Sequence, residues 1–262
     1  MTPPPAASRA ATARERARAE LTREIKEEAR RQLVATGADG LSLRAVAREL
    51  GMVSSALYRY YPSRDDLLTA LIIDAYDALG AAAEQAIAGP VSAAGTVSAA
   101  GTVPARERWD AACHAIRDWA RSNPHEYALI YGSPVPGYHA PEATIGPAAR
   151  VPLAFVGLVQ GALSAGELTA AADGLPVAGA LAEQAAALSA ALERSAASPE
   201  SPAGNGAPAV PPDVLVRAVL AWTQLFGMVS FELFGQFVGS FEPADALFAH
   251  AVAQLAAFVG FR

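Results

Sequence analysis

A short segment of this 262-residue sequence gathers hydroxyl, phenol and guanidinium groups around a few small side chains. The residues concerned are Arg44, Ser54, Ser55, Ala56, Tyr58, Arg59, Tyr60 and Arg64. Arginine and tyrosine donate hydrogen bonds to phosphate oxygens, while serine hydroxyls, arginine and a methyl group can meet base edges. The segment therefore predicts contact with DNA. We expect its phosphate anchors to be Arg44, Tyr58 and Arg64, and its groups nearer the bases to be Ser54, Ser55, Ala56 and Arg59.

Two short helices joined by a glycine turn would hold these side chains. Ser42 can cap a helix whose apolar residues recur at i, i+3, i+4 and i+7, namely Leu43, Val46, Ala47 and Leu50. Gly51 supplies a sharp turn, and a third helix over residues 54–60 buries Leu57 and, after it, Tyr61. Pro62 ends that helix, and residues 63–66 start a fourth helix with a capping box. The pattern predicts a helix-turn-helix, with a plain helical hairpin in a bundle as the competing interpretation.

The charge of the chain is divided unevenly. Residues 1–64 hold 12 Lys and Arg and 7 Asp and Glu, leaving 8 of the 20 basic and 19 of the 26 acidic residues for the remainder. A basic end is expected where a chain meets phosphates. Residues 1–12 are predicted to form a disordered basic arm that continues into a first helix over residues 13–36. The arm and the start of this helix together carry Arg9, Arg14, Arg16 and Arg18. A solvated helix start and phosphate contact explain these arginines equally well.

The stretch GADGLSLRAVARELGMVSSALYRYYPSRDDLLTAL resembles the DNA-binding domain of the TetR family of bacterial regulators, over about residues 20–72. The matching features are the Gly before the second helix, the A-x-x-L-G turn at 47–51, Leu57-Tyr58, an aromatic at Tyr61, and Pro-Ser-Arg before Leu67-Leu68. The resemblance implies an all-α fold: an N-terminal three-helix helix-turn-helix DNA-binding domain and a helical-bundle domain for ligand binding and dimerisation. It also places the family's DNA contacts on the eight residues named above.

Two positions depart from the family pattern. Val53 stands where many members have a capping serine, which predicts that the cap shifts to Ser54. Ala56 replaces a common threonine, so only a methyl group is left there to meet a thymine.

The expected domain organisation follows the same resemblance. A helix-turn-helix domain over residues 13–64 precedes an effector-binding and dimerisation domain over residues 65–262, and the fourth helix runs to about Ala88. Flexible loops are predicted at 89–104, where VSAAGT occurs twice in tandem, and at 196–212. The Pro/Gly-rich segment 133–152 predicts a long loop before a helix over 153–165.

The segments 127–138 and 221–235 resemble the C-terminal domain of a TetR subgroup named for a Trp-His-Gly motif. Trp222 and Gly227 match the motif, whereas Phe226 stands in the place of the histidine. Aromatic residues of this region carry enough apolar surface to line a cavity for a lipophilic ligand, although each of them singly also fits a core position. They are Trp109, Trp119, Tyr127, Tyr131, Phe155, Trp222, Phe226 and Phe231.

The apolar pattern of the last two expected helices predicts a dimer interface. Gly227, Phe231 and Gly235 recur at i, i+4 and i+8, and apolar residues repeat along the final helix, so pairing both helices with their symmetry mates gives a four-helix interface. A homodimer also suits a palindromic double-stranded operator, because two recognition helices reach successive major grooves about 34 Å apart.

Together these features predict a homodimeric, sequence-specific transcriptional regulator, a repressor that a small lipophilic ligand releases from its operator. The alternatives are an enzyme with a vestigial DNA-binding head and a regulator that uses no ligand. No Ser/His/Asp set, phosphate-binding glycine loop or paired metal ligands support an enzyme, a cofactor or a metal site, and Cys113 and His114 diverge by about 100° on one helix. The chain shows no secretory signal, and its most apolar stretch, 218–231, is shorter than the roughly 20 residues that span a bilayer. A cytoplasmic protein without membrane association is expected.

Overall fold

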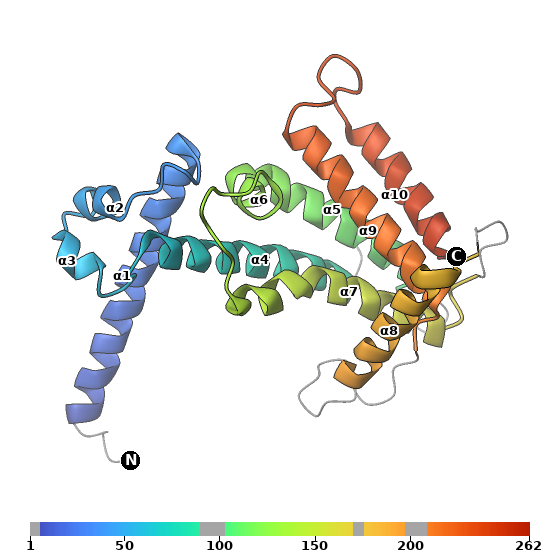
Figure 1. Cartoon of the computed structure of the whole chain (residues 1–262), viewed down its shortest axis with the longest axis horizontal. Coiled ribbons are helices and arrows are strands. Elements are labelled where there is room, and N and C mark those ends of the chain that lie inside the picture. The colour runs from blue at the N-terminus through green and yellow to red at the C-terminus, as the bar shows by residue number, and fades with distance from the viewer. Residues whose placement is uncertain (1–5, 90–102, 170–175, 197–208) are drawn as a thin grey trace. The chain divides into compact units, whose positions relative to one another are not determined.

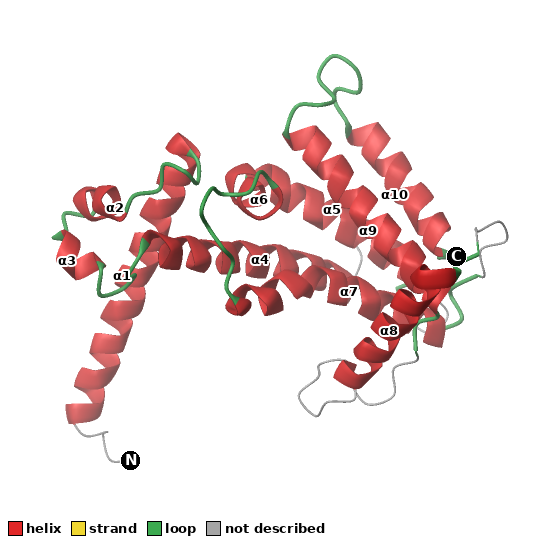
Figure 2. Cartoon of the chain, in the orientation of Figure 1, coloured by secondary structure: helices red, strands yellow, loops and turns green. Residues whose placement is uncertain are grey.

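The computed structural model describes residues 6–89, 103–169, 176–196 and 209–262, and in these ranges the regular elements are helices (Figure 1, Figure 2). The predicted all-α class is confirmed. The chain divides into two compact units: unit 1 comprises Met1–Ala75 and His125–Ile145, and unit 2 comprises Tyr76–Pro124 and Gly146–Arg262. The tandem VSAAGT repeat and most of the 196–212 segment lie outside the described residues.

Unit 1 is built around one long helix and the short helices that follow it. α1 (Ala6–Thr36) begins before the expected start at residue 13, and α2 (Leu43–Glu49), α3 (Ser54–Leu57) and the first half of α4 (Arg64–Ala88) follow. α6 (Pro124–Tyr131) and the 3-10 turn η1 (Glu142–Thr144) complete the unit. Its core consists of buried apolar side chains from α1 to α4, including Ile25, Leu33, Val46, Leu57 and Leu68.

Unit 2 contains the second half of α4 and five further helices. These are α5 (Ala105–Ser122), α7 (Ile145–Ser164), α8 (Gly179–Ala196), α9 (Pro212–Leu233) and α10 (Asp245–Val259). Trp109 of α5 lies at the centre of the core, where its ring centroid is 4.9 Å from that of Phe155 and 5.6 Å from that of Phe261. Its indole Nε1 donates a hydrogen bond to the carbonyl oxygen of Val252, so α5 and α10 are held together by a buried polar contact as well as by packing.

A nearly buried arginine joins three helices of unit 2. The side chain of Arg117 on α5 is 5% exposed, and its Nε and Nη2 donate to the two carboxylate oxygens of Glu232 on α9 at 2.6 and 2.7 Å. Its Nη1 donates to Asp245 on α10 at 3.0 Å, and its guanidinium lies 4.8 Å from the ring centre of Phe248. Hydrogen bonding to Arg117 lowers the pKa of the Asp245 carboxyl.

Helix α7 corrects the expected loop over residues 133–152. The helix begins at Ile145 and continues through Pro152, a residue that removes one backbone donor from a helix. Two residues before Pro152, Arg150 donates to both carboxylate oxygens of Glu84 and to Asp77. It lies so close to Gly80 that a Cβ on Gly80 would be 2.7 Å from the Arg150 Cβ. These contacts with α4 stabilise the helical conformation around Pro152, which proline by itself disfavours.

Two helical segments are long and apolar enough to cross a membrane by length and composition, Glu142–Ser164 and α9. Both contribute buried residues to the core of unit 2, among them Phe155 and Leu158 from α7 and Leu225 and Val229 from α9. Core helices of soluble proteins have this same composition.

Candidate nucleic-acid interface

The turn between α2 and α3 has the geometry that the sequence predicts. The Ser42 hydroxyl accepts a hydrogen bond from the Ala45 amide at 3.4 Å, which confirms Ser42 as the cap of α2. Gly51 has φ +65°, a left-handed conformation that favours glycine, and the Met52 amide donates to the Ala47 carbonyl oxygen at 2.8 Å to close the turn. The chain therefore leaves α2 and enters α3 through a sharp, hydrogen-bonded corner.

Helix α3 is shorter than predicted and begins differently. The prediction that Ser54 is the cap is wrong: Val53 occupies the cap position in an extended conformation and offers no side-chain acceptor. The helix ends at Leu57 instead of Tyr60, because the amides of Arg59 and Tyr60 donate three residues back, to Ala56 and Leu57, and tighten the chain into turns.

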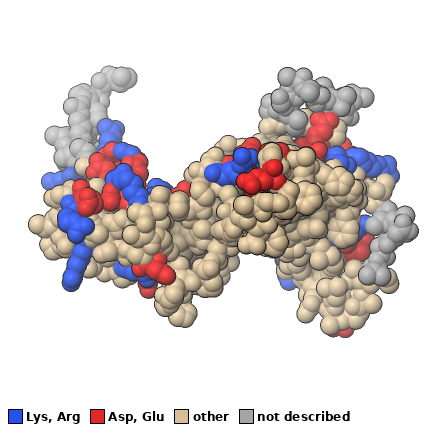
Figure 3. All heavy atoms as spheres, turned by 90° about the horizontal axis from the view of Figure 1, so that it is seen from above, with Lys and Arg blue, Asp and Glu red and all other residues tan. Residues whose placement is uncertain are grey.

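The eight predicted DNA contacts divide into two groups by exposure. The four exposed side chains are those of Arg44, Ser55, Tyr58 and Arg59. The four partly exposed ones are those of Ser54, Ala56, Tyr60 and Arg64. Leu57 is fully buried and fixes the inner side of α3 to the core. Figure 3 shows Lys and Arg atoms on this part of the molecule, at the left of the view, with Asp and Glu atoms between them.

Arg64 has a structural role that sequence reasoning missed. Its Nη2 donates to the Ala38 carbonyl oxygen at 2.7 Å, which ties the start of α4 to the turn between α1 and α2. Beside it, the Ser63 hydroxyl accepts from the Asp66 amide at 3.1 Å and donates to the Asp66 carboxylate at 2.7 Å, so Ser63 caps the start of α4 through its side chain.

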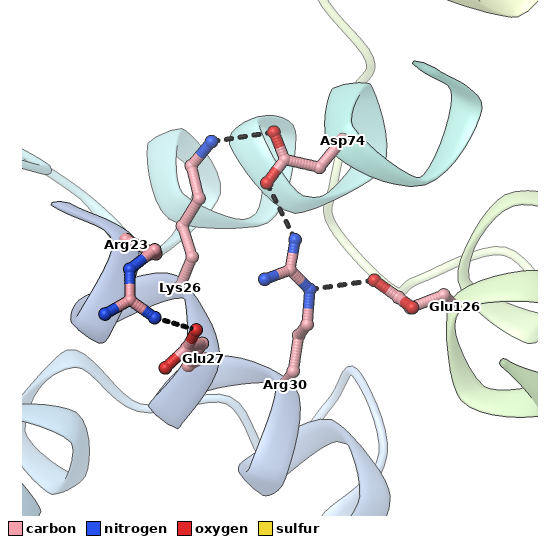
Figure 4. A network of polar contacts seen from close by, with 6 residues as sticks. All are labelled: Arg23, Lys26, Glu27, Arg30, Asp74 and Glu126. Carbon is pink, nitrogen blue, oxygen red and sulfur yellow. Dashed lines mark hydrogen bonds and ion pairs between the residues drawn. The ribbon is translucent and has the colours of Figure 1, made fainter. Parts of the chain in front are cut away.

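A group of four ion-paired residues, here called the α1 clamp, connects three helices of unit 1 (Figure 4). Asp74 on α4 accepts from Lys26 at 2.7 Å and from Arg30 at 2.8 Å, both on α1. Arg30 also donates through Nε to Glu126 on α6 at 2.8 Å. The spacing of Lys26 and Arg30, i and i+4 on one helix face, is the only signal in the sequence that could have indicated the clamp.

The eight aromatic residues predicted for a ligand site do not share one location. Tyr127 and Tyr131 pair on α6 in unit 1 with ring centroids 5.2 Å apart, and the other six belong to unit 2. There, Trp109 and Phe155 pack together in the core and Trp222 packs edge-on against Phe226, while Trp119 is partly exposed.

Phe231 differs from the other predicted ligand residues, because it is 55% exposed and contacts Phe237 at a centroid distance of 6.0 Å. A pocket of about 200 Å³ in unit 2 is lined by the segment 237–245 of the α9–α10 connection together with Arg121 and Glu232. None of the eight predicted residues lines it.

Cys113 and His114 point in different directions, as their adjacency on α5 requires. Cys113 is fully buried, and burial raises the pKa of its thiol well above the usual value. The His114 Nδ1 lies 2.8 Å from the Asp110 carbonyl oxygen, and its ring meets Phe248 edge-on. Within the described ranges, His, Cys, Asp and Glu side chains form no group of three that could hold a metal ion.

Comparison with known proteins agrees with this architecture. Residues 25–71 match the family model described as bacterial regulatory proteins of the tetR family, and residues 109–255 match the Tetracyclin repressor-like C-terminal domain. The HTH-type transcriptional regulators Rv1816 of Mycobacterium tuberculosis and Mb1846 of Mycobacterium bovis are each 38% identical to this chain over 226 residues, 84% of either protein.

Solved structures show the same fold. The regulatory protein SCO4313 is 32% identical, with a TM-score of 0.64 over 93% of this chain and 98% of that one. A protein from Rhodococcus sp. RHA1, 22% identical over 91% and 93% of the two chains, has a TM-score of 0.60 and supports the fold alone. The resemblance to the Trp-His-Gly subgroup stays a prediction. The two family models and the mycobacterial relatives show that this chain belongs to the TetR family of bacterial transcriptional regulators.

Proposed function

We propose that the protein is a homodimeric repressor that reads a palindromic operator through α3 and releases it when a small lipophilic ligand binds unit 2. The observation that carries the DNA-reading part is the exposure of Ser55 on α3 and of Tyr58 and Arg59 in the turn that follows it, next to the buried Leu57. A hydrogen-bonding surface held by one buried anchor can enter the major groove without rearranging the core.

The lipophilic character of the proposed ligand is supported by the aromatic side chains of unit 2. Trp222 and Phe226 lie on α9, and Trp119 lies partly exposed on α5. The Trp222 Nε1 is buried, and no hydrogen-bond partner for it occurs among the described residues. Because a buried donor without an acceptor is unfavourable, a ligand with an apolar body and one acceptor atom would suit this position.

The alternative of an enzyme is not favoured by any feature described above, and the relatives named above are transcriptional regulators. We therefore place the protein in the cytoplasm, where its operator is. A regulator without a ligand is the second candidate, since the core position of Trp109 and the solvent exposure of Phe231 withdraw two of the eight predicted ligand contacts.

The experiment that tests the proposal is selection of DNA fragments from the producing genome by the full-length protein, followed by competition with long-chain fatty acids and with polycyclic aromatic compounds. Enrichment of a palindromic sequence and its release by one compound class support the whole proposal. Enrichment that every compound leaves unchanged supports the ligand-independent regulator, and transcription that rises on addition of the protein contradicts repression.

The α1 clamp is proposed to transmit movement of α4 to the DNA-reading helix. α4 runs from unit 1 into unit 2, and Asp74 joins it to Lys26 and Arg30 of α1 through side chains that are 22–32% exposed. Hydrogen bonds between charged groups contribute about 1.5–3 kcal/mol each when they are partly shielded from water. A shift of α4 would therefore carry α1 with it, together with the helix-turn-helix packed on α1.

Replacing Asp74 by asparagine is expected to weaken this connection, because two cations then share a neutral acceptor. We expect protection of the α1 amides against hydrogen exchange to fall by about 1–2 kcal/mol, and ligand to release less of the bound operator. Asp39→Asn, an exposed aspartate between α1 and α2, is the matched control. Equal protection in both variants would show that packing alone joins α1 to α4.

The dimer is proposed to form through α9 and α10. Exposed residues on α9 lie along one stripe that includes Leu220, Gly227 and Phe231, and Phe258 is exposed on α10. One position of the predicted interface is corrected, because Gly235 lies beyond the end of α9. Val229, on the same helix, is buried within the chain and does not belong to the exposed stripe. An exposed apolar stripe along a helix pair is the surface that an isologous four-helix interface buries.

Replacing Phe231 by glutamate is expected to raise the dimer dissociation constant at least 30-fold, about 2 kcal/mol, because the change places a charge within the apolar stripe. Sedimentation velocity over a concentration series measures the constant. Leu188→Glu, a similarly exposed leucine on α8, is the control and should leave it unchanged. If Leu188→Glu dissociates the dimer and Phe231→Glu does not, the interface lies on α8.

A further inference from the structure

The first turns of α1 project from unit 1 as a basic helix. α1 begins at Ala6, and its first fully buried side chain among the described residues is Ile25. Every residue from Arg14 to Glu20 is exposed. At 1.5 Å per residue, the helix from Ala6 to Arg18 extends about 18 Å. Residues 14–20 contribute no side chain to the described core, so burial in unit 1 does not account for their helical conformation.

The overhang is joined to the DNA-reading surface at its base. The Arg18 guanidinium lies 5.6 Å from the centre of the Tyr60 ring, in the turn that directly follows α3. Arg14 lies one turn further out on the same helix face as Arg18, whereas Arg16 is rotated by about 200° from both. The helix face that carries Arg14 and Arg18 is therefore the face of α1 that lies next to Tyr60.

Three exposed arginines of α1, Arg14, Arg16 and Arg18, can meet an external partner. Arg23, nearer the core, is paired with Glu20 and Glu27. For Arg14, Arg16 and Arg18, no carboxylate partner occurs in the described part of the chain. Residues 6–18 hold four arginines and one glutamate, with alanine at six of the other positions.

We infer that this overhang is a second DNA-binding element, and that Arg14 contacts phosphates flanking the base pairs that α3 reads. The small side chain of the exposed Ala17, one turn from Arg14, allows close approach to the DNA backbone, and guanidinium groups bind phosphate oxygens. The partner is double-stranded DNA because Arg18 already touches the α3 turn, so a duplex seated on α3 lies next to the same helix face. The inference rests on the proposed DNA-reading role of α3.

The salt dependence of operator binding tests the inference, and the two faces of the overhang provide a matched pair. Arg14→Ala and Arg16→Ala each remove one charge from an exposed position, so neither change is expected to affect folding, which circular dichroism checks. Each phosphate contact contributes about 0.9 to the slope of log K against log salt concentration. We expect Arg14→Ala to reduce the slope by about 1.8 for a dimer and Arg16→Ala to leave it unchanged.

Phosphate ethylation interference on the same duplex locates the contact. Arg14→Ala should lose interference at phosphates outside the α3 footprint, and Arg16→Ala should retain it. Equal slopes and equal interference patterns in both variants would overturn the inference while leaving the function of α3 intact. Failure of the unaltered protein to bind any selected duplex would instead contradict the proposed function itself.

Discussion

Replacing Arg59 by alanine is expected to weaken operator binding by about 2–6 kcal/mol per dimer, at least roughly 30-fold. Arg59 is exposed in the turn that follows α3, next to Tyr58, which is 41% exposed. An arginine in this position can form two parallel hydrogen bonds to a guanine edge, and one such contact is lost in each half-site. Loss of a base contact lowers affinity for the operator more than affinity for unrelated DNA.

Fluorescence anisotropy with operator and scrambled duplexes measures both affinities. Arg59→Ala should reduce their ratio, whereas Arg44→Ala should lower both together, because Arg44 on α2 is expected to contact phosphate. Arg194→Ala, an exposed arginine on α8, serves as the charge control and should change neither. An unchanged ratio in Arg59→Ala would show that Arg59 is a phosphate anchor and that the bases are read by Ser54 and Ser55.

Replacing Arg117 by alanine is expected to destabilise unit 2 by about 3–5 kcal/mol and to lower the midpoint of thermal unfolding by about 6–20 °C. The substitution leaves Glu232, whose side chain is 17% exposed, without its two hydrogen bonds from Arg117. It also removes the cation above the Phe248 ring. Three helices lose a shared contact, and the loss of both short hydrogen bonds to the mostly buried Glu232 carboxylate is the largest part of the cost.

Arg121→Ala is the matched control for this prediction, because Arg121 contacts the same two carboxylates from a side chain that is 49% exposed. Its removal should cost at most about 1 kcal/mol. The double substitution Arg117→Met and Glu232→Leu should recover much of the lost stability, since removing both charges also removes their desolvation. Thermal unfolding followed by circular dichroism distinguishes the three variants, and equal midpoints for the two single variants would contradict a buried ion pair at Arg117.

Local sequence signals predicted the helix-turn-helix accurately wherever one residue determines the backbone. Ser42 caps α2, Gly51 turns the chain at positive φ, and the Ser63 hydroxyl caps α4 by bonding to Asp66. Each effect depends on groups within four residues of one another. The exception is Val53: because it has no side-chain acceptor, the sequence predicts a shift of the cap to Ser54, whereas the chain keeps position 53 as the cap and starts α3 without a side-chain hydrogen bond.

Contacts between distant parts of the chain could not be predicted in this way. Arg30 and Glu126 are 96 residues apart, and Arg117 and Glu232 are 115 residues apart, so no periodicity in the sequence connects them. The helical path of α7 through Pro152 likewise depends on Arg150 and its partners on α4. For the proposed ligand site, composition indicated an aromatic domain but could not assign Trp109 to the core or Phe231 to the surface.

The brevity of α3 has an evolutionary consequence. Among residues 53–60 only Leu57 is buried, and the cap at Val53 contributes no side-chain hydrogen bond. Substitutions at exposed positions of this kind usually change stability by less than about 0.5 kcal/mol. Residues 54–56, 58 and 59 can therefore diverge among descendants of a duplicated gene while the domain continues to fold. New regulators with new target genes can arise from this scaffold by exchange of a few surface residues.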